Sequence, residues 1–452
     1  MERPMFTFDP AMADLIFSYC RDRLAMDPVA LDFGGVEQGI DEALEGLLTA
    51  QGHDPELILE RFTTQLATAV ISVDSPRFLS FIPAAPTKAS LLFDMVVSAS
   101  SLNGTSWLEA AGAVAAENQV LRFLADEAGL PDSAGGCFVS GGSIGNLSAL
   151  VVARDRARRR DPSLGGRRLR FAVSEEAHSS IASALRIIDV DAFIVPTDEH
   201  RLTAARLKAM LDADEDPSTI VAVVATGGTT NAGIVDDLEG IGMIARGRGM
   251  WFHVDAAYGG AAMLSRARGH LFTGMSLVDS FIVDPHKWLF APFDCAALLY
   301  REPAEAALTH TQHASYLDVI HDTAGEWNPT DYAIHLTRRA RGLAIWFSLC
   351  TYGIDAYRDA VDQGIAIAEE AARQIQGGEV TELVREPGLS IVLFRRLGWE
   401  EDDYIAWSRE LLASQIGFVT PTKWEGETVA RFAFLHPETS PAMIAEMLST
   451  MT

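Results

Sequence analysis

The stretches WFHVDAAYGG (residues 251–260) and DSFIVDPHKWLFAPFDCAALLYR (279–301) determine the fold. They contain three short, mostly apolar runs, at 251–254, 280–283 and 296–300. Short runs of this kind, without alternation of polar and apolar residues, indicate strands whose two faces are both buried. A sheet buried on both faces needs helices on both of its sides, so these stretches predict an α/β fold.

The preceding sequence repeats this pattern. Apolar runs at 136–142, 169–174, 192–196 and 220–226 alternate with segments of helical length, such as IGNLSALVVARDRARRR (144–160). Strands that alternate with helices are typical of a mostly parallel sheet with helices on both faces. We therefore expect a mostly parallel central sheet across this part of the chain.

The pattern divides the chain into three parts. Residues 1–65 are predicted to be helical, 66–350 to form the large α/β domain, and 351–452 to form a smaller C-terminal α+β domain. The first part is too short to bury a core alone, so it should pack on something larger, such as a second subunit. Because no linker rich in Gly and Ser separates the parts, we expect them to pack together.

Composition excludes several classes of function. A net charge of −26 over 452 residues disfavours nucleic acid and anionic membranes as partners. The four cysteines are widely spaced, which argues against a disulfide framework and a zinc site, and we expect no metal. No apolar run approaches the roughly 18 residues of a membrane helix, and the first residues lack a secretory pattern. The expectation is a soluble, cytoplasmic protein.

Four polar features follow predicted strands, where ligands bind in parallel α/β sheets. Gly141-Gly142-Ser143 could cradle an anion at a helix N-terminus, although such turns are often only tight connections. His178 could bind a ligand or be structural. Asp255 could be a counter-ion for a buried cation or a helix N-cap. Lys287 lies between apolar runs, a setting that lowers the pKa of a lysine and yields a nucleophilic amine, whereas a surface lysine is the alternative.

Together the four features form the set that pyridoxal 5′-phosphate (PLP) requires. The cofactor needs a site for its phosphate, a partner for its pyridine nitrogen and a lysine for its aldehyde. Gly141-Gly142-Ser143, Asp255 and Lys287 supply these groups, and His178 could stack on the ring.

The order and the amino-acid sequence of these segments resemble those of the PLP-dependent group II amino-acid decarboxylases, the family of aromatic-L-amino-acid and glutamate decarboxylases. The resemblance runs from SPRFLSFIPAAP (75–86) to the C-terminus, and HVDAAYGG followed by DPHKW is its most specific part. It implies PLP as cofactor and the aspartate-aminotransferase-like fold (fold type I). It also implies an obligate homodimer with active sites at the subunit interface.

The resemblance implies how the cofactor ring would be held. Lys287 would form the internal aldimine, and Asp255 would keep the pyridine nitrogen protonated so that the ring accepts electrons. His178 would stack on one face of the ring, and Ala257 would contact the other. Thr230 would lie near the cofactor.

The resemblance also implies contacts around the phosphate. Ser143 and the backbone of Gly141 and Gly142 would bind it, while Asp284 and His286 would lie beside the phosphate and the substrate. The animal aromatic enzymes often have Asn where this chain has Asp284. A carboxylate is an unusual neighbour for a phosphate, so Asp284 could hydrogen-bond backbone instead.

A polar loop at 310–332 carries Tyr316, which falls where the family has a proton-donating tyrosine. Family members with Phe there tend toward oxidative aldehyde formation, so Tyr316 favours simple decarboxylation. A tyrosine packed for structural reasons is the alternative.

The substrate pocket implied by the resemblance is apolar, and an aromatic substrate suits it better than glutamate does. Arg77 and Lys88 are close in sequence, but no cation is obviously placed for a side-chain carboxylate. The expected pocket residues are Phe81, Ile82, Pro83, Leu102 and Thr105.

The predicted function is therefore decarboxylation of an L-amino acid to the amine and CO₂, with tryptophan, tyrosine, phenylalanine or DOPA as the expected substrate. Decarboxylation of glutamate or 2,4-diaminobutyrate and aromatic aldehyde synthesis are the enzymatic alternatives. A non-catalytic scaffold protein is the remaining one, and the presence of Lys287 and Asp255 argues against it.

Overall fold

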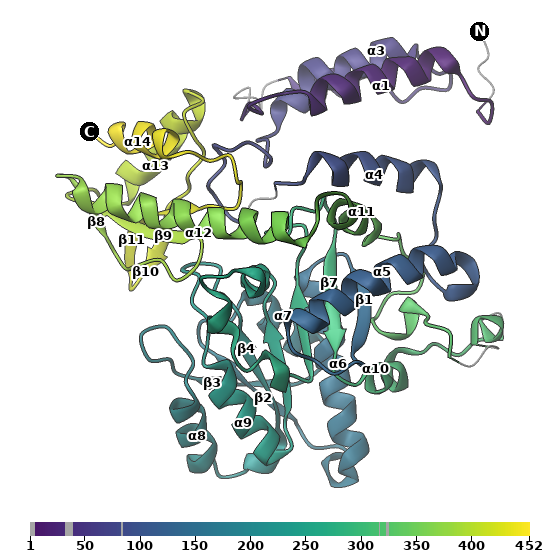
Figure 1. Ribbon diagram of the computed structural model, residues 1–452, viewed down its shortest axis with the longest axis vertical. Helices are drawn as coiled ribbons and strands as arrows, with labels where there is room; N and C mark the ends of the chain where they lie inside the picture. The colour runs from purple at the N-terminus through teal and green to yellow at the C-terminus, as the bar shows by residue number, and fades with distance from the viewer. Residues whose placement is uncertain (1–4, 32–38, 83–84, 316, 322–324) are drawn as a thin grey trace.

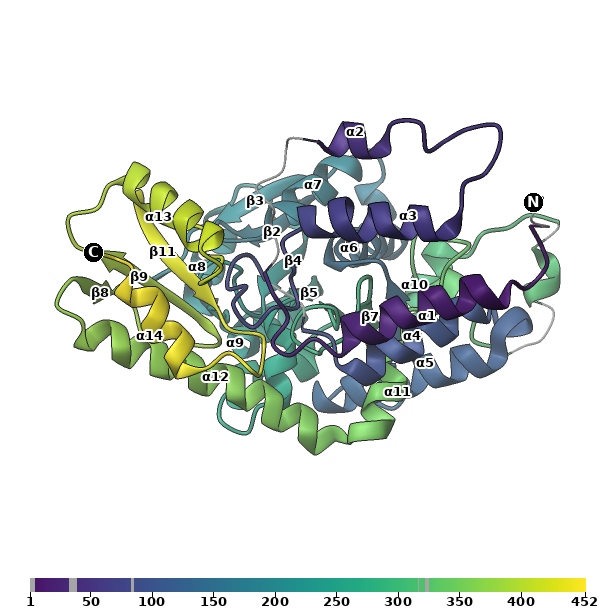
Figure 2. The same cartoon turned by 90° about the horizontal axis from the view of Figure 1, so that it is seen from above.

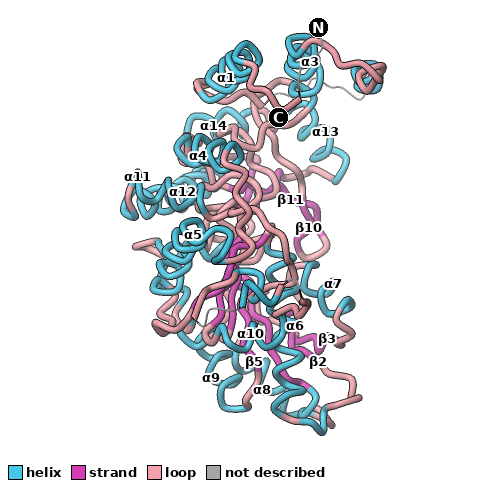
Figure 3. Tube along the Cα trace, turned by 90° about the vertical axis from the view of Figure 1, so that its right-hand side faces the viewer, coloured by secondary structure: helices cyan, strands magenta, loops and turns pink. Residues whose placement is uncertain are grey.

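The computed structural model of the protein describes residues 5–31, 39–82, 85–315, 317–321 and 325–452. Two units, each built on its own sheet, make up most of the molecule (Figure 1). Figure 3 shows the strands of these sheets as two separate groups. Among the described residues, no helix combines the length and the apolar character needed to cross a bilayer.

The large unit contains a seven-stranded sheet in the order β1-β7-β6-β5-β4-β2-β3. Strands β2 to β6 run parallel, and β7 runs antiparallel to both β6 and β1. The prediction of a mostly parallel sheet is confirmed. The strands are β1 (Gly135–Val139), β2 (Arg170–Ser174), β3 (Asp191–Val195), β4 (Ile220–Thr226), β5 (Trp251–Asp255), β6 (Ser280–Val283) and β7 (Ala296–Tyr300).

Helices cover both faces of this sheet, because alternate residues of each strand enter two different cores. Val223 of β4 packs with α5, α8 and α9, whereas its neighbour Val224 packs with α6, α7 and α10. Strand β3 lies at the edge, where Ile194 is half exposed, so its apolar run is not buried on both faces. The helices are α5 (Trp107–Glu127), α6 (Gly142–Arg160), α7 (Ser179–Ile187), α8 (Ala204–Ala213), α9 (Leu238–Arg248) and α10 (Pro303–His310).

The C-terminal unit is the expected α+β structure. Its four strands pair antiparallel in the order β10-β11-β9-β8, and three helices pack on them around a separate core (Figure 2). Helix α11 (Leu343–Tyr352) leads into this unit. Its elements are α12 (Ile354–Gly377), β8 (Thr381–Leu383), β9 (Ile391–Arg396), α13 (Glu401–Ala413), β10 (Thr422–Trp424), β11 (Glu427–Ala433) and α14 (Pro441–Ser449).

The N-terminal helices lie outside the layers that cover the sheets. Helices α1 (Pro10–Leu24) and α3 (Pro55–Arg61) lie side by side at one end of the molecule, with α2 (Ile40–Leu44) between them in sequence (Figures 1 and 2). Neither α1 nor α3 has a buried residue. Helix α4 (Lys88–Ala99) follows and packs on α11.

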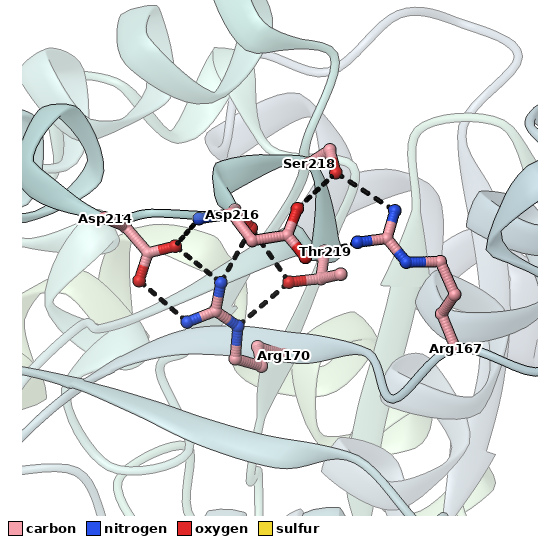
Figure 4. A network of polar contacts seen from close by, with 6 residues as sticks. All are labelled: Arg167, Arg170, Asp214, Asp216, Ser218 and Thr219. Atoms are coloured by element: carbon pink, nitrogen blue, oxygen red, sulfur yellow. Dashed lines mark hydrogen bonds and ion pairs between the residues drawn. The ribbon is translucent and has the colours of Figure 1, made fainter.

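An ion-pair network fastens the start of β2 to the connection between α8 and β4 (Figure 4). The Arg170 guanidinium donates to both carboxylate oxygens of Asp214, at 2.7 and 2.6 Å, and to the Thr219 hydroxyl. The hydrogen bond from Arg170 lowers the pKa of Asp214. Because Arg170 begins its strand, this network lies at the amino end of the sheet, away from the carboxyl ends where ligands bind.

Candidate active site

A cavity of about 430 Å³ opens at the carboxyl ends of the parallel strands. Strands β4, β5 and β6 end at its wall, and α6 begins there. The predicted cofactor residues come together in it, although they are spread over the sequence from 141 to 287. Those that line the cavity are Gly141, Gly142, Ser143, His178, Thr230, Asp255, Ala257, Asp284, His286 and Lys287.

The N-terminus of α6 lies at the cavity wall, where the sequence predicts an anion cradle. Gly141 is the N-cap and has no side-chain cap, and Gly141, Gly142 and Ser143 line the cavity, so the positive end of the helix dipole faces it. Gly142 is tightly enclosed: a Cβ atom there would lie 3.0 Å from Asp284 Oδ2 and 3.1 Å from Ala257 Cβ. A side chain at position 142 would therefore close the approach to the helix N-terminus.

Lys287 reaches into the cavity from the turn after β6. Its ammonium lies 2.9 Å from Asp284 Oδ2, and the Gly142 N–H donates to the same oxygen at 3.2 Å. The sequence predicts apolar surroundings for Lys287, whereas the structure gives its amine a buried carboxylate partner. Oδ1 of Asp284 is buried without a hydrogen bond, which leaves an acceptor available beside the cradle.

His286 is fixed as a neutral ring. The Cys295 N–H donates to Nδ1 at 3.0 Å, which places the ring proton on Nε2. Burial lowers the pKa of His286, so the ring is uncharged at neutral pH. Phe293 packs on it with ring centroids 5.0 Å apart, and Nε2 lies 3.6 Å from Asp284 Oδ2.

Asp255 ends β5 and is buried, at 7% exposure. Its Oδ1 accepts from the Ala257 N–H at 3.2 Å, and its Oδ2 accepts from Asn146 Nδ2 at 2.9 Å. Asp255 is not a helix N-cap, because the next helical turn begins at Gly259 with Tyr258 as its N-cap, but it accepts a local hydrogen bond, and a second donor from α6 adds to it. The carboxylate remains at the cavity wall, where it can meet a protonated ring nitrogen.

His178 has a structural contact and also faces the cavity. It is the N-cap of α7, where Nδ1 accepts from the Ser180 N–H at 3.2 Å. The side chain is exposed at the cavity wall and can cover a planar ligand. Of the two neighbouring threonines, Thr229 is buried and accepts from the Ile234 N–H, whereas Thr230 is exposed at the wall.

Among the described residues, the predicted substrate-pocket residues Phe81, Ile82, Leu102 and Thr105 do not line the cavity of this single chain. Phe81 is 63% exposed and packs near Phe78 and Phe418, Leu102 packs against a small core beside α4, and Thr105 is buried. Ile82 packs at the edge of the main core. Tyr316 and Pro83 lie outside the described residues.

Among the lining residues that were not predicted from the sequence are Asn146, Glu176 and Asp294. Asn146 follows Gly142 by four residues, so helical spacing places both on one face of α6, and this signal could have identified it. Glu176 and Asp294 are held by long-range pairs, to His200 at 2.7 Å and to Arg341 at 2.7 Å. No sequence signal indicates those pairs.

These groups fit PLP. The helix N-terminus and Gly142 provide an anion cradle, Asp255 provides a carboxylate for a ring nitrogen, and Lys287 provides an amine for an aldehyde. His178 provides an exposed ring beside them. The fold and the site together define a PLP-dependent enzyme of fold type I.

The comparisons with known proteins narrow the class. The model of the pyridoxal-dependent decarboxylase conserved domain matches residues 42–397. An aromatic-L-amino-acid decarboxylase of Bacillus atrophaeus is 32% identical over 88% of this chain and 85% of its own length. An L-2,4-diaminobutyrate decarboxylase of Acinetobacter baumannii is 27% identical, with 80% and 75% covered. The Oryza sativa TDC structure with PLP and tryptamine superposes with a TM-score of 0.90 at 24% identity, over 98% and 99% of the two chains.

This chain belongs to the pyridoxal-dependent decarboxylase family. It is a PLP-dependent carboxy-lyase that acts on an amino acid, as the resemblance implied. The predictions of the cofactor, the fold type and the enzyme class are confirmed.

Proposed function

We propose that the enzyme decarboxylates an L-amino acid with an uncharged, apolar side chain, an aromatic amino acid in particular, to the amine and CO₂. The observation that carries this proposal is the distribution of charge around the cavity. Among the described residues that line it, Lys287 is the one Lys or Arg, and it is committed to the cofactor. A substrate carboxylate on the side chain, as in glutamate, would therefore lack a counter-ion.

A second amine on the substrate would also lack a partner. The two acidic lining residues outside the cofactor set are Glu176 and Asp294, and each already has a basic side chain as its partner. Glu176 Oε1 lies 2.7 Å from His200 Nδ1, and Asp294 Oδ1 lies 2.7 Å from Arg341 Nε. This pairing disfavours 2,4-diaminobutyrate, although a relative with that substrate exists.

PLP, when bound, supplies an aldehyde for an amine and a ring that accepts the electrons released as CO₂ leaves. In this proposal, Lys287 binds the aldehyde, Asp255 keeps the ring nitrogen protonated, and His178 and Ala257 enclose the ring. Gly141, Gly142 and Ser143 bind the phosphate at the start of α6, with Thr230, Asp284 and His286 around it. Electrostatic stabilisation by Asp255 is the largest contribution expected from the protein.

The proposal includes a homodimer. Helices α1 and α3 bury no residue in their own chain, and large apolar side chains are exposed at Phe81, Leu92 and Leu108. A second copy of the chain would cover these surfaces, because monomers rarely leave extended apolar surface in water. The predicted pocket residues would then serve the partner's cavity: Phe81, Ile82, Pro83, Leu102 and Thr105.

Tyr316 would return the proton to the substrate carbon after CO₂ leaves. On the C-terminal side of this position, Leu317 and Ile320 are buried, and the Asn328 amide donates to the Ile320 carbonyl at 2.8 Å. A hydroxyl donor at this point favours the amine over an aldehyde.

A substrate panel tests the proposal. The purified enzyme with PLP is offered each of the twenty common amino acids, DOPA and 2,4-diaminobutyrate, and amine, CO₂ and hydrogen peroxide are measured. We expect amine and CO₂ in equal amounts from aromatic amino acids, without peroxide. A higher kcat/KM for glutamate or 2,4-diaminobutyrate would refute the substrate class, and peroxide in proportion to CO₂ would show aldehyde synthesis instead.

A further inference from the structure

A chain of buried hydrogen bonds reaches Asp255 along the face of the sheet that α6 covers. Asn146 Nδ2 donates to Asp255 Oδ2 at 2.9 Å, and Asn146 Oδ1 lies 2.8 Å from His253 Nε2. His253 Nδ1 lies 2.8 Å from Ser280 Oγ, which also accepts from Trp251 Nε1 at 2.8 Å. Each of the four side chains behind Asp255 is at least 98% buried.

The direction of every bond in this chain is determined. An ionised Asp255 can only accept, so the NH₂ of Asn146 faces it and the Asn146 carbonyl faces His253. Nε2 of His253 must then carry the proton, and Nδ1 must accept from the Ser280 hydroxyl. The last bond of the chain runs from the indole N–H of Trp251 to the Ser280 hydroxyl oxygen, because an indole N–H can only donate.

The histidine in this chain is neutral. Complete burial lowers the pKa of His253 to about 4. The ring therefore serves as a donor at Nε2 and an acceptor at Nδ1, and it brings no positive charge near Asp255. The negative charge of Asp255 is stabilised by a dipolar donor, which leaves it available for a cation in the cavity.

A second branch leads from the same amide to the other side of the site. Asn146 Nδ2 also lies 3.3 Å from Ser180 Oγ, which lies 2.9 Å from His178 Nδ1. Because the Ser180 N–H also donates to Nδ1, the outward-facing Nε2 of His178 carries the proton. One amide thus contacts both the carboxylate and the hydroxyl that holds the histidine ring.

We infer that Asn146, held by His253, is the positioning residue that keeps Asp255 ionised and aimed at the cofactor's ring nitrogen and that steadies His178 through Ser180. This inference rests on the proposed role of Asp255. Neither Asn146 nor His253 touches the reacting atoms, so their removal should act through the ring nitrogen and not through the phosphate or the aldehyde.

Cofactor binding tests the inference without measuring turnover. The purified enzyme is stripped of cofactor, and the Kd values of PLP and of the analogue with carbon in place of the ring nitrogen are measured by quenching of tryptophan fluorescence. The ratio of the two Kd values reports the contact at the ring nitrogen alone. Asn146→Leu, which keeps the side-chain size, should reduce the preference for PLP about tenfold, because a hydrogen bond to a charged group is lost.

Three further variants make the result decisive. His253→Phe should shift the ratio in the same direction by less, since Asn146 remains but loses its support; this variant decides if Asn146→Leu does not fold. Ser148→Ala is the control: its hydroxyl is equally buried on α6 but donates to the Ile144 carbonyl and accepts from the Ile334 N–H, so the ratio should not change. Asp255→Ala should abolish the preference.

Two results would overturn the inference in distinguishable ways. If Asn146→Leu and His253→Phe weaken both cofactors equally while Asp255→Ala abolishes the preference, the chain is structural and the role of Asp255 stands. If the unaltered enzyme shows no preference for PLP, Asp255 does not meet the ring nitrogen, and the inference fails together with that part of the proposed function.

Discussion

The buried ion pair between Glu117 and Arg338 gives the sharpest prediction for stability. Glu117 lies in α5, and Arg338 lies in the segment that leads from the Tyr316 loop to α11. The guanidinium forms two bonds to the carboxylate, both 2.7 Å long, and both side chains are at most 2% exposed. The Gly342 N–H donates to Glu117 at 2.8 Å, and Arg338 donates to the Gly104 carbonyl at 2.7 Å. The pair therefore joins three segments.

Glu117→Ala should destabilise the enzyme by about 3–5 kcal/mol, because it leaves the charge of Arg338 buried without its partner. Burial alone would lower the pKa of Arg338, and the Coulombic attraction of Glu117 and the hydrogen bonds to it outweigh that effect, so the pKa is raised. Removing Glu117 leaves only the burial penalty. Nε of Arg338 already lacks a hydrogen bond, so the site has no spare acceptor to offer.

The double variant Glu117→Leu with Arg338→Met separates charge from packing. It removes both ions, so the loss should shrink to about 1 kcal/mol, because the Gly104 carbonyl then lacks its donor and the Gly342 N–H lacks its acceptor. Urea unfolding at one protein concentration measures both variants, with the m value checked for two-state behaviour. A double variant as unstable as Glu117→Ala, or a single variant within about 1 kcal/mol of the unaltered enzyme, would refute the reasoning.

Three more predictions address the site. Lys287→Ala should abolish turnover, and borohydride reduction of the holoenzyme should attach the cofactor to position 287 only when the lysine is present; attachment elsewhere contradicts the assignment. Tyr316→Phe should lower the amine yield and raise aldehyde and peroxide with little change in KM; an unchanged amine yield removes the proton-donor role. Partial burial opposes a charge on His200, but its hydrogen bonds to Glu176 and Glu425 outweigh it and raise its pKa. Its stabilising effect should therefore be complete below about pH 6.5 and decline as the pH rises through the raised pKa, a decline in Tm that His200→Gln should remove.

The sequence predicted the parallel strands, and with them the edge of the sheet at which the candidate cofactor residues meet. Asp255 ends β5 and Lys287 follows β6, and parallel strands bring both to one edge of the sheet. The antiparallel direction of β7 was not predicted, since AALLY is as apolar as the parallel strands. Residues 284–295 between β6 and β7 contain no helix, and a parallel connection usually needs one, so the direction could have been inferred.

The rest of the site depends on contacts that no local pattern encodes. The pairing of Glu176 with His200 and of Asp294 with Arg341 joins segments that are distant in sequence, and it decides which charges remain for a substrate. The edge position of β3 likewise follows from strand order, not from its composition. The substrate pocket was predicted from residues before α5, and a single chain does not bring the described ones, Phe81, Ile82, Leu102 and Thr105, to the cavity.

The net negative charge of the chain disfavours the anionic cofactor and substrate that the site should bind. Hydrogen-bond donors at the site can offset this repulsion. A net charge of −26 repels the phosphate of PLP and the carboxylate of the substrate. Asp284 at the cradle adds to that repulsion, but it is covered on one oxygen by Lys287 and the Gly142 N–H. In the proposed site, the donors for an anion at the start of α6 include the N–H and the hydroxyl of Ser143, which carry dipoles and no titratable charge. Such donors hold an anion at any physiological pH, and at short range in a buried site they outweigh a distant field that salt screens.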